Sequence, residues 1–407
     1  MALNIIIKRS LFSNNHNFVL IPIATYSSQN FRTLDENFIS IKRGTGYRSS
    51  FNGIVCTVFG GSGFIGKNII QRLGKYGTQV TLKFSVIIPY RHELYSSFEN
   101  KTAGDLGQIY FSEFCLNDDD SIRKCMKYSD VVINLIGKDH DTWNYTLEQV
   151  NIEGARKIAK ICKEMGIKKF IHVSALNASP NPRAFMIKNG SRFLKSKWYG
   201  EIAVREEFPE AIIVKPSDVY GEGDTFISYY GRTSRLINRT LYLWAKGFET
   251  IKQPVFVWDV SHGLYELVTR HVQDVAGKTY QFVGPRGYIL HDLCKFMFAN
   301  MWKNEKWGFQ IEDARLDLCF QIYRIILNKF YLTSPSHLQT LERFEREHVS
   351  DEIEENGLTL KDLGIKKLIN FEDMMFSYSL IWKAPGEFVD DVYQFQPPPP
   401  PKIIREI

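Results

Sequence analysis

Three glycines spaced three residues apart form the pattern with the clearest chemical meaning in this chain. A short apolar run, residues 54–59, leads into them, and an amphipathic segment, residues 67–73, follows. A strand, a tight turn and a helix start in this order let backbone N–H groups and the positive helix end approach a pyrophosphate. The pattern predicts a dinucleotide site, and the residues predicted to form it are Gly60, Ser62, Gly63, Phe64, Ile65 and Gly66.

The same stretch also satisfies a second glycine spacing. Gly61, Gly63 and Gly66 fit the pattern G-x-G-x-x-G, so spacing alone does not separate two kinds of dinucleotide fingerprint. The alternative is a tight strand–helix turn that binds no ligand. The apolar run before the turn and the amphipathic segment after it favour the ligand.

An arginine follows the second predicted strand, where a dinucleotide site contacts the adenosine ribose. An acid at this place hydrogen-bonds the 2′-hydroxyl of NADH, whereas a base accommodates the 2′-phosphate of NADPH. The chain has Pro89-Tyr90-Arg91 here and no acid before Glu93. Because a guanidinium group binds phosphate in a bidentate manner, Arg91 predicts NADPH as the cofactor. A surface arginine without a ligand is the alternative.

Strand-like and helix-like segments alternate along the first half of the chain, which predicts an α/β fold with a doubly wound parallel sheet. The segment 77–91 is apolar throughout and longer than an ordinary strand, which favours an insertion at 81–86. One long strand and a strand with a bulge are the alternatives. Strands are expected at 54–59, within 79–89, and at 109–114, 131–136, 170–173 and 212–215. Helices are expected at 67–74, 119–127, 147–165 and 193–207.

The regular alternation stops near residue 240, and the pattern there indicates a smaller, mixed and mainly helical C-terminal part. Strands are expected at 255–257 and 279–283, a helix at 260–270, and largely amphipathic helix over 289–328. The predicted parts are a leader (1–34), a linker (35–50), a Rossmann domain for NAD(P) (51–240), a C-terminal domain (241–390) and a proline-rich tail (391–407).

The first 34 residues have the composition of a mitochondrial presequence. They contain Lys8, Arg9 and Arg32 but no Asp or Glu, and they are rich in Ser and Asn. An N-terminal segment without a targeting role is the alternative. Without these three basic residues, 48 Lys and Arg face 45 Asp and Glu, so the charge gives no reason to expect nucleic-acid binding.

Cysteines and apolar runs exclude two further classes of protein. The six cysteines form no C-x-x-C motif and the nine histidines show no ligand spacing, so we expect no metal site. No stretch supplies the roughly 20 apolar residues of a membrane span, so we expect no transmembrane segment.

Motifs along residues 50–370 resemble those of the extended short-chain dehydrogenase/reductases. More narrowly, the chain resembles the atypical members that bind NADPH as accessory subunits of mitochondrial respiratory complex I. The motifs that carry the resemblance are the three glycines, Asn134-Leu135-Ile136-Gly137, Ile171-His172-Val173-Ser174 and 214–221. The closer match is carried by 87–91, 104–108, 131–137, 208–218, 252–255 and 363–365.

The resemblance implies further residues on the cofactor side of the site. An acid that holds the adenine amine in this family falls near Cys115, and a thiol is a poor acceptor for that amine. Asp118 matches a second acid of the same motif, which leaves adenine recognition open. The cofactor residues that the resemblance implies are Gly60, Gly63, Gly66, Arg91, Asp118, Leu135, Ile136, Gly137, Ser174, Lys197 and Pro216.

The resemblance also implies that the catalytic acid is missing. These reductases use Tyr-x-x-x-Lys on the helix after the fifth strand, and the chain has Phe193 in place of the tyrosine, four residues before Lys197. Loss of a positioned acid or base slows a reaction by about 10²–10⁴-fold. Tyr199 would point away around the helix, and the pair Tyr242 and Lys246 comes too late in the chain. We therefore expect no catalytic residue.

Taken together, the resemblance implies a non-catalytic accessory subunit of complex I. It would bind NADPH, lie on the matrix side peripheral to the mitochondrial inner membrane, and support assembly or stability of the matrix arm. Its C-terminal aromatic residues would form a docking surface, or the core of the small domain. The alternatives are an active NADP-dependent reductase or epimerase and a free NADP(H)-sensing protein.

Overall fold

The computed structural model of this chain describes the greater part of its 407 residues. The described residues are 53–79, 84–91, 94–104, 108–232, 235–303, 309–329, 340–354, 357–382 and 398–406. The predicted leader (1–34), the predicted linker (35–50) and residues 81–83 of the predicted insertion lie outside them. The leader and the linker therefore stay predictions. Residues 84–86 of the predicted insertion form the start of β2 (Phe84–Tyr90), so an insertion does not extend over them.

An eight-stranded parallel sheet forms the centre of the described fold. Its strands are β1 (Ile54–Phe59), β2 (Phe84–Tyr90), β3 (Ile109–Glu113), β4 (Val131–Asn134), β5 (Lys169–Val173), β6 (Ile212–Pro216), β11 (Thr279–Phe282) and β14 (Leu358–Thr359). Their order is β3-β2-β1-β4-β5-β6-β11-β14, and neighbouring strands run parallel. The doubly wound parallel sheet is thereby confirmed. The order reverses between β1 and β4, where sheets of this kind bind ligands at the carboxyl ends of the strands.

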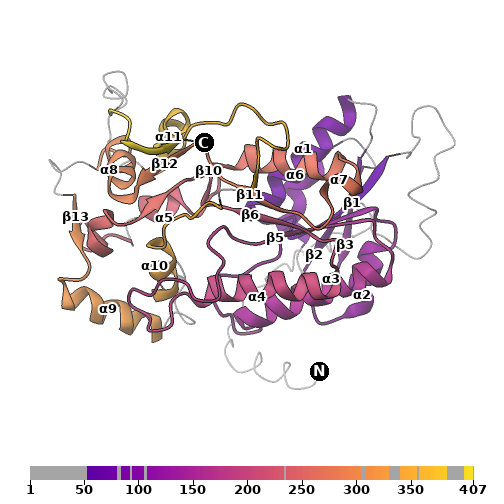
Figure 1. Cartoon of the computed structure of the whole chain (residues 1–407), viewed down its shortest axis with the longest axis horizontal. Coiled ribbons are helices and arrows are strands. Elements are labelled where there is room, and N and C mark those ends of the chain that lie inside the picture. Colours follow the sequence, from indigo (N-terminus) through magenta and orange to yellow (C-terminus); the bar gives the residue numbers. More distant parts are fainter. Residues whose placement is uncertain are drawn as a thin grey trace, which may run out of the picture. The chain divides into compact units, whose positions relative to one another are not determined.

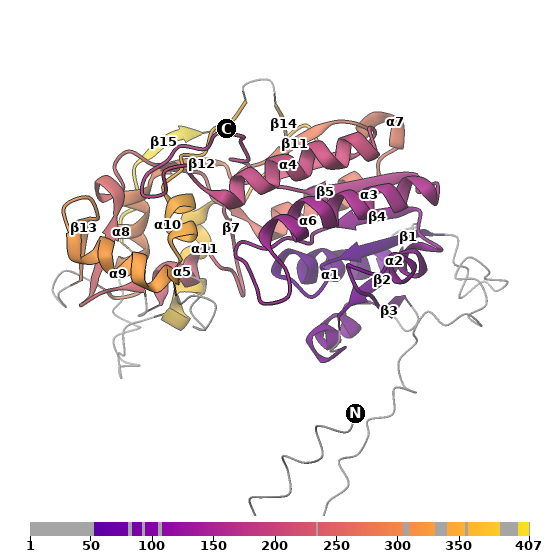
Figure 2. The ribbon, with the colours of Figure 1, turned by 90° about the horizontal axis from the view of Figure 1, so that it is seen from below.

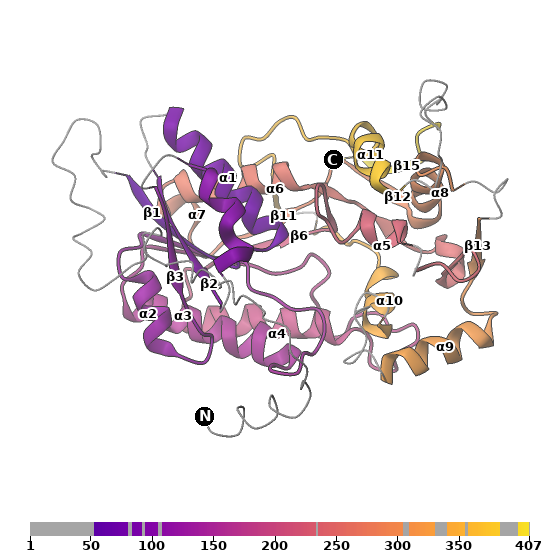
Figure 3. The ribbon, with the colours of Figure 1, turned by 180° about the vertical axis from the view of Figure 1, so that it is seen from behind.

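Helices cover both faces of the sheet (Figure 1). On one face lie α1 (Phe64–Gln79) and α6 (Val257–Thr269), and on the other lie α2 (Asp119–Met126), α3 (Ala155–Glu164) and α4 (Arg192–Glu207). Figure 2 looks onto the face that α3 and α4 cover. Figure 3 shows α1 and α6 side by side, in agreement with their mutual contacts.

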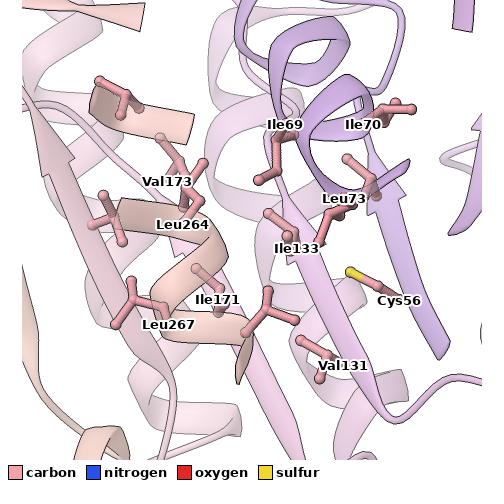
Figure 4. Packing of buried hydrophobic residues seen from close by; sticks show 14 of the residues in the cluster. Cys56, Ile69, Ile70, Leu73, Val131, Ile133, Ile171, Val173, Leu264 and Leu267 are labelled. Carbon is pink, nitrogen blue, oxygen red and sulfur yellow. The ribbon is translucent and has the colours of Figure 1, made fainter. Parts of the chain in front are cut away.

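The apolar core between the sheet and its two helices α1 and α6 fixes the start of α1 (Figure 4). Ile69, Ile70 and Leu73 lie on one face of α1 and are fully buried. Full burial of such a side chain contributes roughly 1.5–3 kcal/mol. The side chains that they meet in this cluster include Cys56, Val131, Ile133, Ile171, Val173, Leu264 and Leu267. This packing holds the glycine turn, which leads directly into α1, against the sheet.

The chain returns to the sheet after residue 240, so the predicted C-terminal domain (241–390) contributes strands to the same sheet as the predicted Rossmann domain (51–240). β11 pairs with β6, β14 pairs with β11, and α6 covers the sheet. A parallel neighbour can be added to β6 only through a crossover connection, and α6 supplies it. The strand periodicity at 279–283 is visible in the sequence, but its place in the sheet is not.

The remaining elements include a smaller part of short strands and helices. They are η2 (Leu94–Thr102), η3 (Gln149–Gly154), β7 (Val219–Tyr220), α5 (Ile227–Gly231), β8 (Thr240–Leu243), η5 (Trp244–Gly247), β9 (Ile251–Lys252), β10 (Val255–Phe256), α7 (Val272–Val275), β12 (Arg286–Ile289), α8 (Leu290–Asn300), β13 (Gln310–Asp313), α9 (Leu318–Lys329), α10 (Leu341–Glu347), α11 (Phe371–Ser379), η8 (Leu380–Trp382) and β15 (Ile403–Glu406). The predicted long helix over 289–328 is divided among α8, β13 and α9. The end of the predicted tail forms β15, which pairs with β12. Among the helices within the described ranges, none is long and apolar enough to cross a membrane.

Candidate functional site

The turn between β1 and α1 has the geometry that the approach of a phosphate requires. Gly60 adopts φ +82°, a conformation that side-chain-bearing residues rarely take. The N–H of Gly63 donates to the carbonyl of Gly60 at 3.0 Å, which closes the turn. α1 begins at Phe64, and the first N–H groups of a helix have no partner within it. The turn therefore presents donors and the positive helix end to the same space.

The second and third glycines have different physical roles. A Cβ on Gly66 would lie 2.3 Å from the Gly60 carbonyl oxygen and 2.7 Å from the Gly61 Cα, so only glycine fits there. A Cβ on Gly63 would come no closer than 3.2 Å to its nearest neighbour in the described structure, the Gly60 carbonyl oxygen. Gly66 is thus needed for packing of the helix against the turn, whereas Gly63 leaves space on the ligand side.

A first cavity, of about 210 Å³, lies at the switch point between β1 and β4. It joins three segments that are distant in sequence: the glycine turn, the end of β2 and the residues after β4. The predicted residues that line it are Gly60, Ser62, Gly63, Arg91, Leu135, Ile136 and Gly137. Arg91 is exposed at this cavity, where a phosphate can reach its guanidinium group. The fit of these residues to the adenosine half of a dinucleotide is therefore good.

Asp118 has a structural role and does not line this cavity. Its carboxylate accepts the N–H of Asp120 at 3.1 Å and caps the start of α2. The wall beside it is apolar and aromatic, with Phe114, Leu116 and Tyr145 facing the cavity. These side chains offer contact surface to a base rather than the acceptor that the resemblance implied for Asp118.

A second cavity, also of about 210 Å³, continues from the start of α1 to the ends of β5 and β6. Four of the predicted residues line it: Phe64, Ile65, Ser174 and Pro216. Phe193, which stands in the place of the catalytic tyrosine, lines it as well. This is the end of the site at which a nicotinamide ring would lie.

Lys197 lies behind the second cavity as a buried cation. Its Nζ donates to the carbonyl of Val173 at 3.3 Å, and a Cβ on Gly137 would come within 2.7 Å of it. Burial lowers the pKa of Lys197 to about 8, although the carboxylate of Glu201 acts in the opposite direction. The ammonium group therefore lies between β5 and the loop after β4, where it can hold a ribose.

Because Lys197 is buried, the free energy of unfolding of the dinucleotide-free protein should increase from pH 7 to pH 10. The pKa of Lys197 is about 8 in the folded chain and returns to its ordinary value of 10.5 on unfolding, so the unfolded chain binds more protons between these values. Below about pH 8, burial of the charged ammonium group destabilises the folded chain. This destabilisation disappears as the pH rises toward 10.5, and the free energy of unfolding increases by roughly 3 kcal/mol over the whole range. Urea unfolding of the unaltered chain and of Lys197→Met should show a stability difference that changes with pH in this sense. A stability difference that does not change with pH would contradict the lowered pKa of Lys197.

A buried polar chain that sequence reasoning missed engages Ser174. The hydroxyl of Ser174 donates to Glu201 Oε1 at 2.5 Å, and Glu201 Oε2 lies 3.1 Å from Nζ of Lys215. All three residues are buried, and burial raises the pKa of Glu201. The proton of the Ser174 hydroxyl is thus engaged by a neighbouring carboxylate. No local sequence signal links β5, α4 and β6 in this way.

Phe193 has two cations near its ring, and the two tyrosines weighed as replacements do not reach the cavities. The guanidinium carbon of Arg346 lies 4.4 Å from its ring centroid, and Nζ of Lys197 lies 6.0 Å away. Tyr199 is largely exposed, and neither it nor Tyr242 lines the two cavities. Within the described ranges, no group of three or more His, Cys, Asp or Glu side chains could hold a metal ion. The two cavities offer space for the two halves of a dinucleotide, and the side chain at position 193 has no ionisable group.

Comparisons with known proteins agree with this site. The model of the NAD dependent epimerase/dehydratase family matches residues 56–281. The chain is 39% identical over 80% of its length to "NADH dehydrogenase (ubiquinone) 1 alpha subcomplex subunit 9, mitochondrial" of Mus musculus, covering 80% of that protein. It is 31% identical over 80% of its length to "NADH-ubiquinone oxidoreductase 40 kDa subunit, mitochondrial" of Neurospora crassa, covering 79% of it.

A solved structure supports the same fold. The dTDP-glucose 4,6-dehydratase of Bacillus anthracis, determined in complex with NAD, matches 64% of this chain and 84% of its own with a TM-score of 0.50 and 18% identity. At this identity the likeness concerns the fold alone. On the family model and the two sequence matches, the chain belongs to the NAD dependent epimerase/dehydratase family and, within it, to the family of mitochondrial complex I subunits named 1 alpha subcomplex subunit 9.

Proposed function

We propose that this chain is a non-catalytic accessory subunit of mitochondrial complex I that binds NADPH. The observation that supports this most strongly is the contrast between the two ends of the site. The glycine turn and Arg91 line one cavity, where they would hold a phosphorylated adenosine, whereas Phe193 occupies the place of the proton donor at the other. A dinucleotide that binds only the folded state stabilises it, and this makes a held cofactor a structural element.

Arg91 supports NADPH over NADH. The residue lies at the end of β2 beside Tyr90, at the same cavity as Gly60 and Gly63. The 2′-phosphate of NADPH would extend from the ribose toward this strand end, and a guanidinium group binds such a phosphate through two parallel hydrogen bonds. The second strand ends in Pro89-Tyr90-Arg91 without a carboxylate that would repel this phosphate.

Absence of catalysis is supported by the state of three side chains at the nicotinamide end. Phe193 has no ionisable group, the hydroxyl of Ser174 donates to Glu201, and Arg346 covers the Phe193 ring. An active reductase would need another acid at the second cavity. Two carboxylates line the second cavity, those of Asp218 and Asp351. Both pair with Lys252, whose Nζ lies 3.0 Å from the Asp218 oxygen and 3.6 Å from the Asp351 oxygen.

An apolar face on α9 supports a position peripheral to the inner membrane, in contact with other complex I subunits on the matrix side. The exposed side chains are aliphatic at helical spacing: Leu318, Ile322, Ile325 and Ile326 are 49–69% exposed. The sequence predicts that seven C-terminal aromatic residues form a docking surface or the core of the small domain. Phe320 is buried, Trp302 and Phe309 are half-buried and Tyr323 is exposed, while Trp307, Phe330 and Tyr331 lie outside the described residues. An exposed face of this kind is typical of a docking surface at a partner or a membrane interface. We infer that the subunit supports assembly and stability of the matrix arm through such contacts.

The cofactor assignment is tested by Arg91→Ala. Loss of the charge-assisted hydrogen bonds to the 2′-phosphate should weaken NADPH binding by about tenfold to a hundredfold and leave NADH binding nearly unchanged. Dissociation constants for both nucleotides, measured by titration calorimetry, give the ratio. Arg156→Ala is the matched control, because Arg156 pairs with Glu206 on the surface, at 3.1 Å, and lines neither cavity. An equal loss for both nucleotides would refute the contact with the 2′-phosphate.

A further inference from the structure

One short helix contacts nearly every part of the nicotinamide end. α10 (Leu341–Glu347) comes from the C-terminal part of the chain, about 150 residues after the segments that it touches. Two of its side chains, Arg343 and Arg346, form part of the wall of the second cavity. We refer to this helix as the strap. Its contacts link α4, the loop after β4 and the small C-terminal part.

The strap caps the helix that positions Lys197 and Phe193. Both carboxylate oxygens of Glu342 accept hydrogen bonds at the start of α4: from the Ser191 hydroxyl, from the Arg192 N–H at 3.1 Å and from the Phe193 N–H at 2.9 Å. A carboxylate at this place also interacts favourably with the positive end of the helix. The N-terminus of α4 therefore depends on a residue of the strap.

A second residue of the strap joins α4 to the cofactor side of the site. The guanidinium group of Arg346 stacks on Phe193 at 4.4 Å and lies 3.6 Å from Asp139. Asp139 follows Lys138, which lines the first cavity. Movement of the strap would break the contact with the nicotinamide end and the contact with the loop after β4 together.

Further contacts fix the strap from its other sides. Glu345 accepts the N–H groups of Phe185, Met186 and Ile187 at 2.5–3.2 Å. Glu347 is buried against Arg235, with an oxygen–nitrogen distance of 3.1 Å. With the strap in place, the second cavity measures only about 210 Å³. Pockets that enclose a whole organic ligand usually measure about 300–1,000 Å³. The nicotinamide half of a dinucleotide would fill most of this space and leave no room for a substrate beside it.

We propose that α10 acts as a strap that closes the nicotinamide end of the site, excludes a second substrate and slows release of the dinucleotide. This inference rests on the proposed function, because it takes a dinucleotide to be the resident ligand. The nucleotide leaves only after the contacts of Glu342 and Arg346 with α4 have opened. With the strap closed, the site retains its dinucleotide and admits no substrate that the dinucleotide could react with.

The strap also connects the site to α9. The rings of Phe344 and Phe320 lie 5.6 Å apart, and Nη2 of Arg324 donates to the carbonyl of Thr340, the residue that caps the strap, at 3.3 Å. The dinucleotide should therefore reduce amide hydrogen exchange in α10 and α9 together, because closing the strap orders the surface against which α9 packs.

The test compares Glu342→Gln and Arg346→Gln with the unaltered full chain and with Glu206→Gln. Glu206 is a matched control because it belongs to α4, the helix that the strap caps, but its carboxylate pairs on the surface with Arg156 of α3. Bound NADPH is displaced with an excess of NADP⁺, and the release of NADPH is followed by the fluorescence of its reduced nicotinamide. We expect release about tenfold faster in the two strap variants and unchanged in the control. Hydrogen exchange of the unaltered chain, with and without NADPH, tests the same proposal without a substitution.

Two results would overturn the proposal in distinguishable ways. Normal NADPH binding with unchanged release in both strap variants, and with no change in exchange of α9 and α10, would overturn the strap alone. Absence of dinucleotide binding by the unaltered chain would overturn the proposed function and, with it, the strap. Thermal unfolding of each variant shows that faster release does not come from loss of the fold.

Discussion

Gly66→Ala should unfold or strongly destabilise this protein, whereas Gly63→Ala should fold and lose its dinucleotide. An added Cβ at residue 66 would lie 2.3 Å from the Gly60 carbonyl oxygen and 2.7 Å from the Gly61 Cα, and both of these atoms belong to the backbone. Overpacking usually costs about 1–3 kcal/mol, and it costs more where no flexible side chain can move away. At residue 63 the nearest described atom, the Gly60 carbonyl oxygen, is 3.2 Å away, so the turn has to shift by only a few tenths of an ångström. The added methyl group would then occupy space that the pyrophosphate needs.

Urea unfolding and NADPH titration of the two variants separate these effects. Gly63→Ala should keep a free energy of unfolding within about 1 kcal/mol of that of the unaltered chain, and its affinity for NADPH should fall by about a hundredfold. Gly166→Ala is a reference for backbone strain without a clash, because Gly166 adopts φ +66° and has no atom within 4 Å of an added Cβ. The account would be contradicted if Gly66→Ala were as stable as the unaltered chain or if Gly63→Ala bound NADPH normally.

Glu347→Gln should destabilise the protein by about 3–5 kcal/mol, since it leaves a buried arginine without its counter-charge. Both side chains of the pair Arg235 and Glu347 are 1–2% exposed, and Glu347 also accepts the hydroxyl of Tyr229 at 2.9 Å. Burial alone would raise the pKa of Glu347, but Arg235 beside it holds the pKa below its ordinary value. The stabilisation by this pair is therefore present above the unfolded-state pKa, near 4.5, and is lost as the pH falls below it.

Chemical unfolding at neutral and at acidic pH measures both parts of this prediction. The control is Glu206→Gln, whose partner Arg156 is exposed, so its effect should stay below about 1 kcal/mol. The difference between the unaltered chain and Glu347→Gln should shrink as the pH falls below about 4.5. Equal effects of the buried and the surface substitution would mean that the Arg235–Glu347 pair does not stabilise the fold.

Local patterns are sufficient to predict strands β1 to β6 of the sheet and the glycine turn. The apolar run 54–59, the three glycines and the alternating helices correspond to β1, the turn and the layers of the structure. The position of Arg91 beside the turn is predictable as well, because adjacent parallel strands bring their carboxyl ends to one edge. The resemblance places Asp118 on the cofactor side and leaves its part in adenine recognition open; in the structure its carboxylate caps α2, as an Asp before a helix commonly does.

Contacts between distant segments cannot be predicted from the same patterns. Glu342 and Arg346 act on α4 across about 150 residues of chain, and their types alone do not distinguish them from the other charged residues around them. The return of β11 and β14 to the sheet escapes prediction for a related reason. Short strands show their periodicity in the sequence, but the strand that each one pairs with depends on the whole topology.

We propose that this subunit holds NADPH within complex I without reacting it. The most direct measurement separates mitochondrial complexes on a native gel and identifies by mass spectrometry the nucleotide that is released from the purified complex and from the chain after denaturation. The account predicts that the chain migrates with complex I and releases NADP(H), about one molecule per chain. Migration apart from complex I, or release of NAD(H) or of no nucleotide, would contradict it.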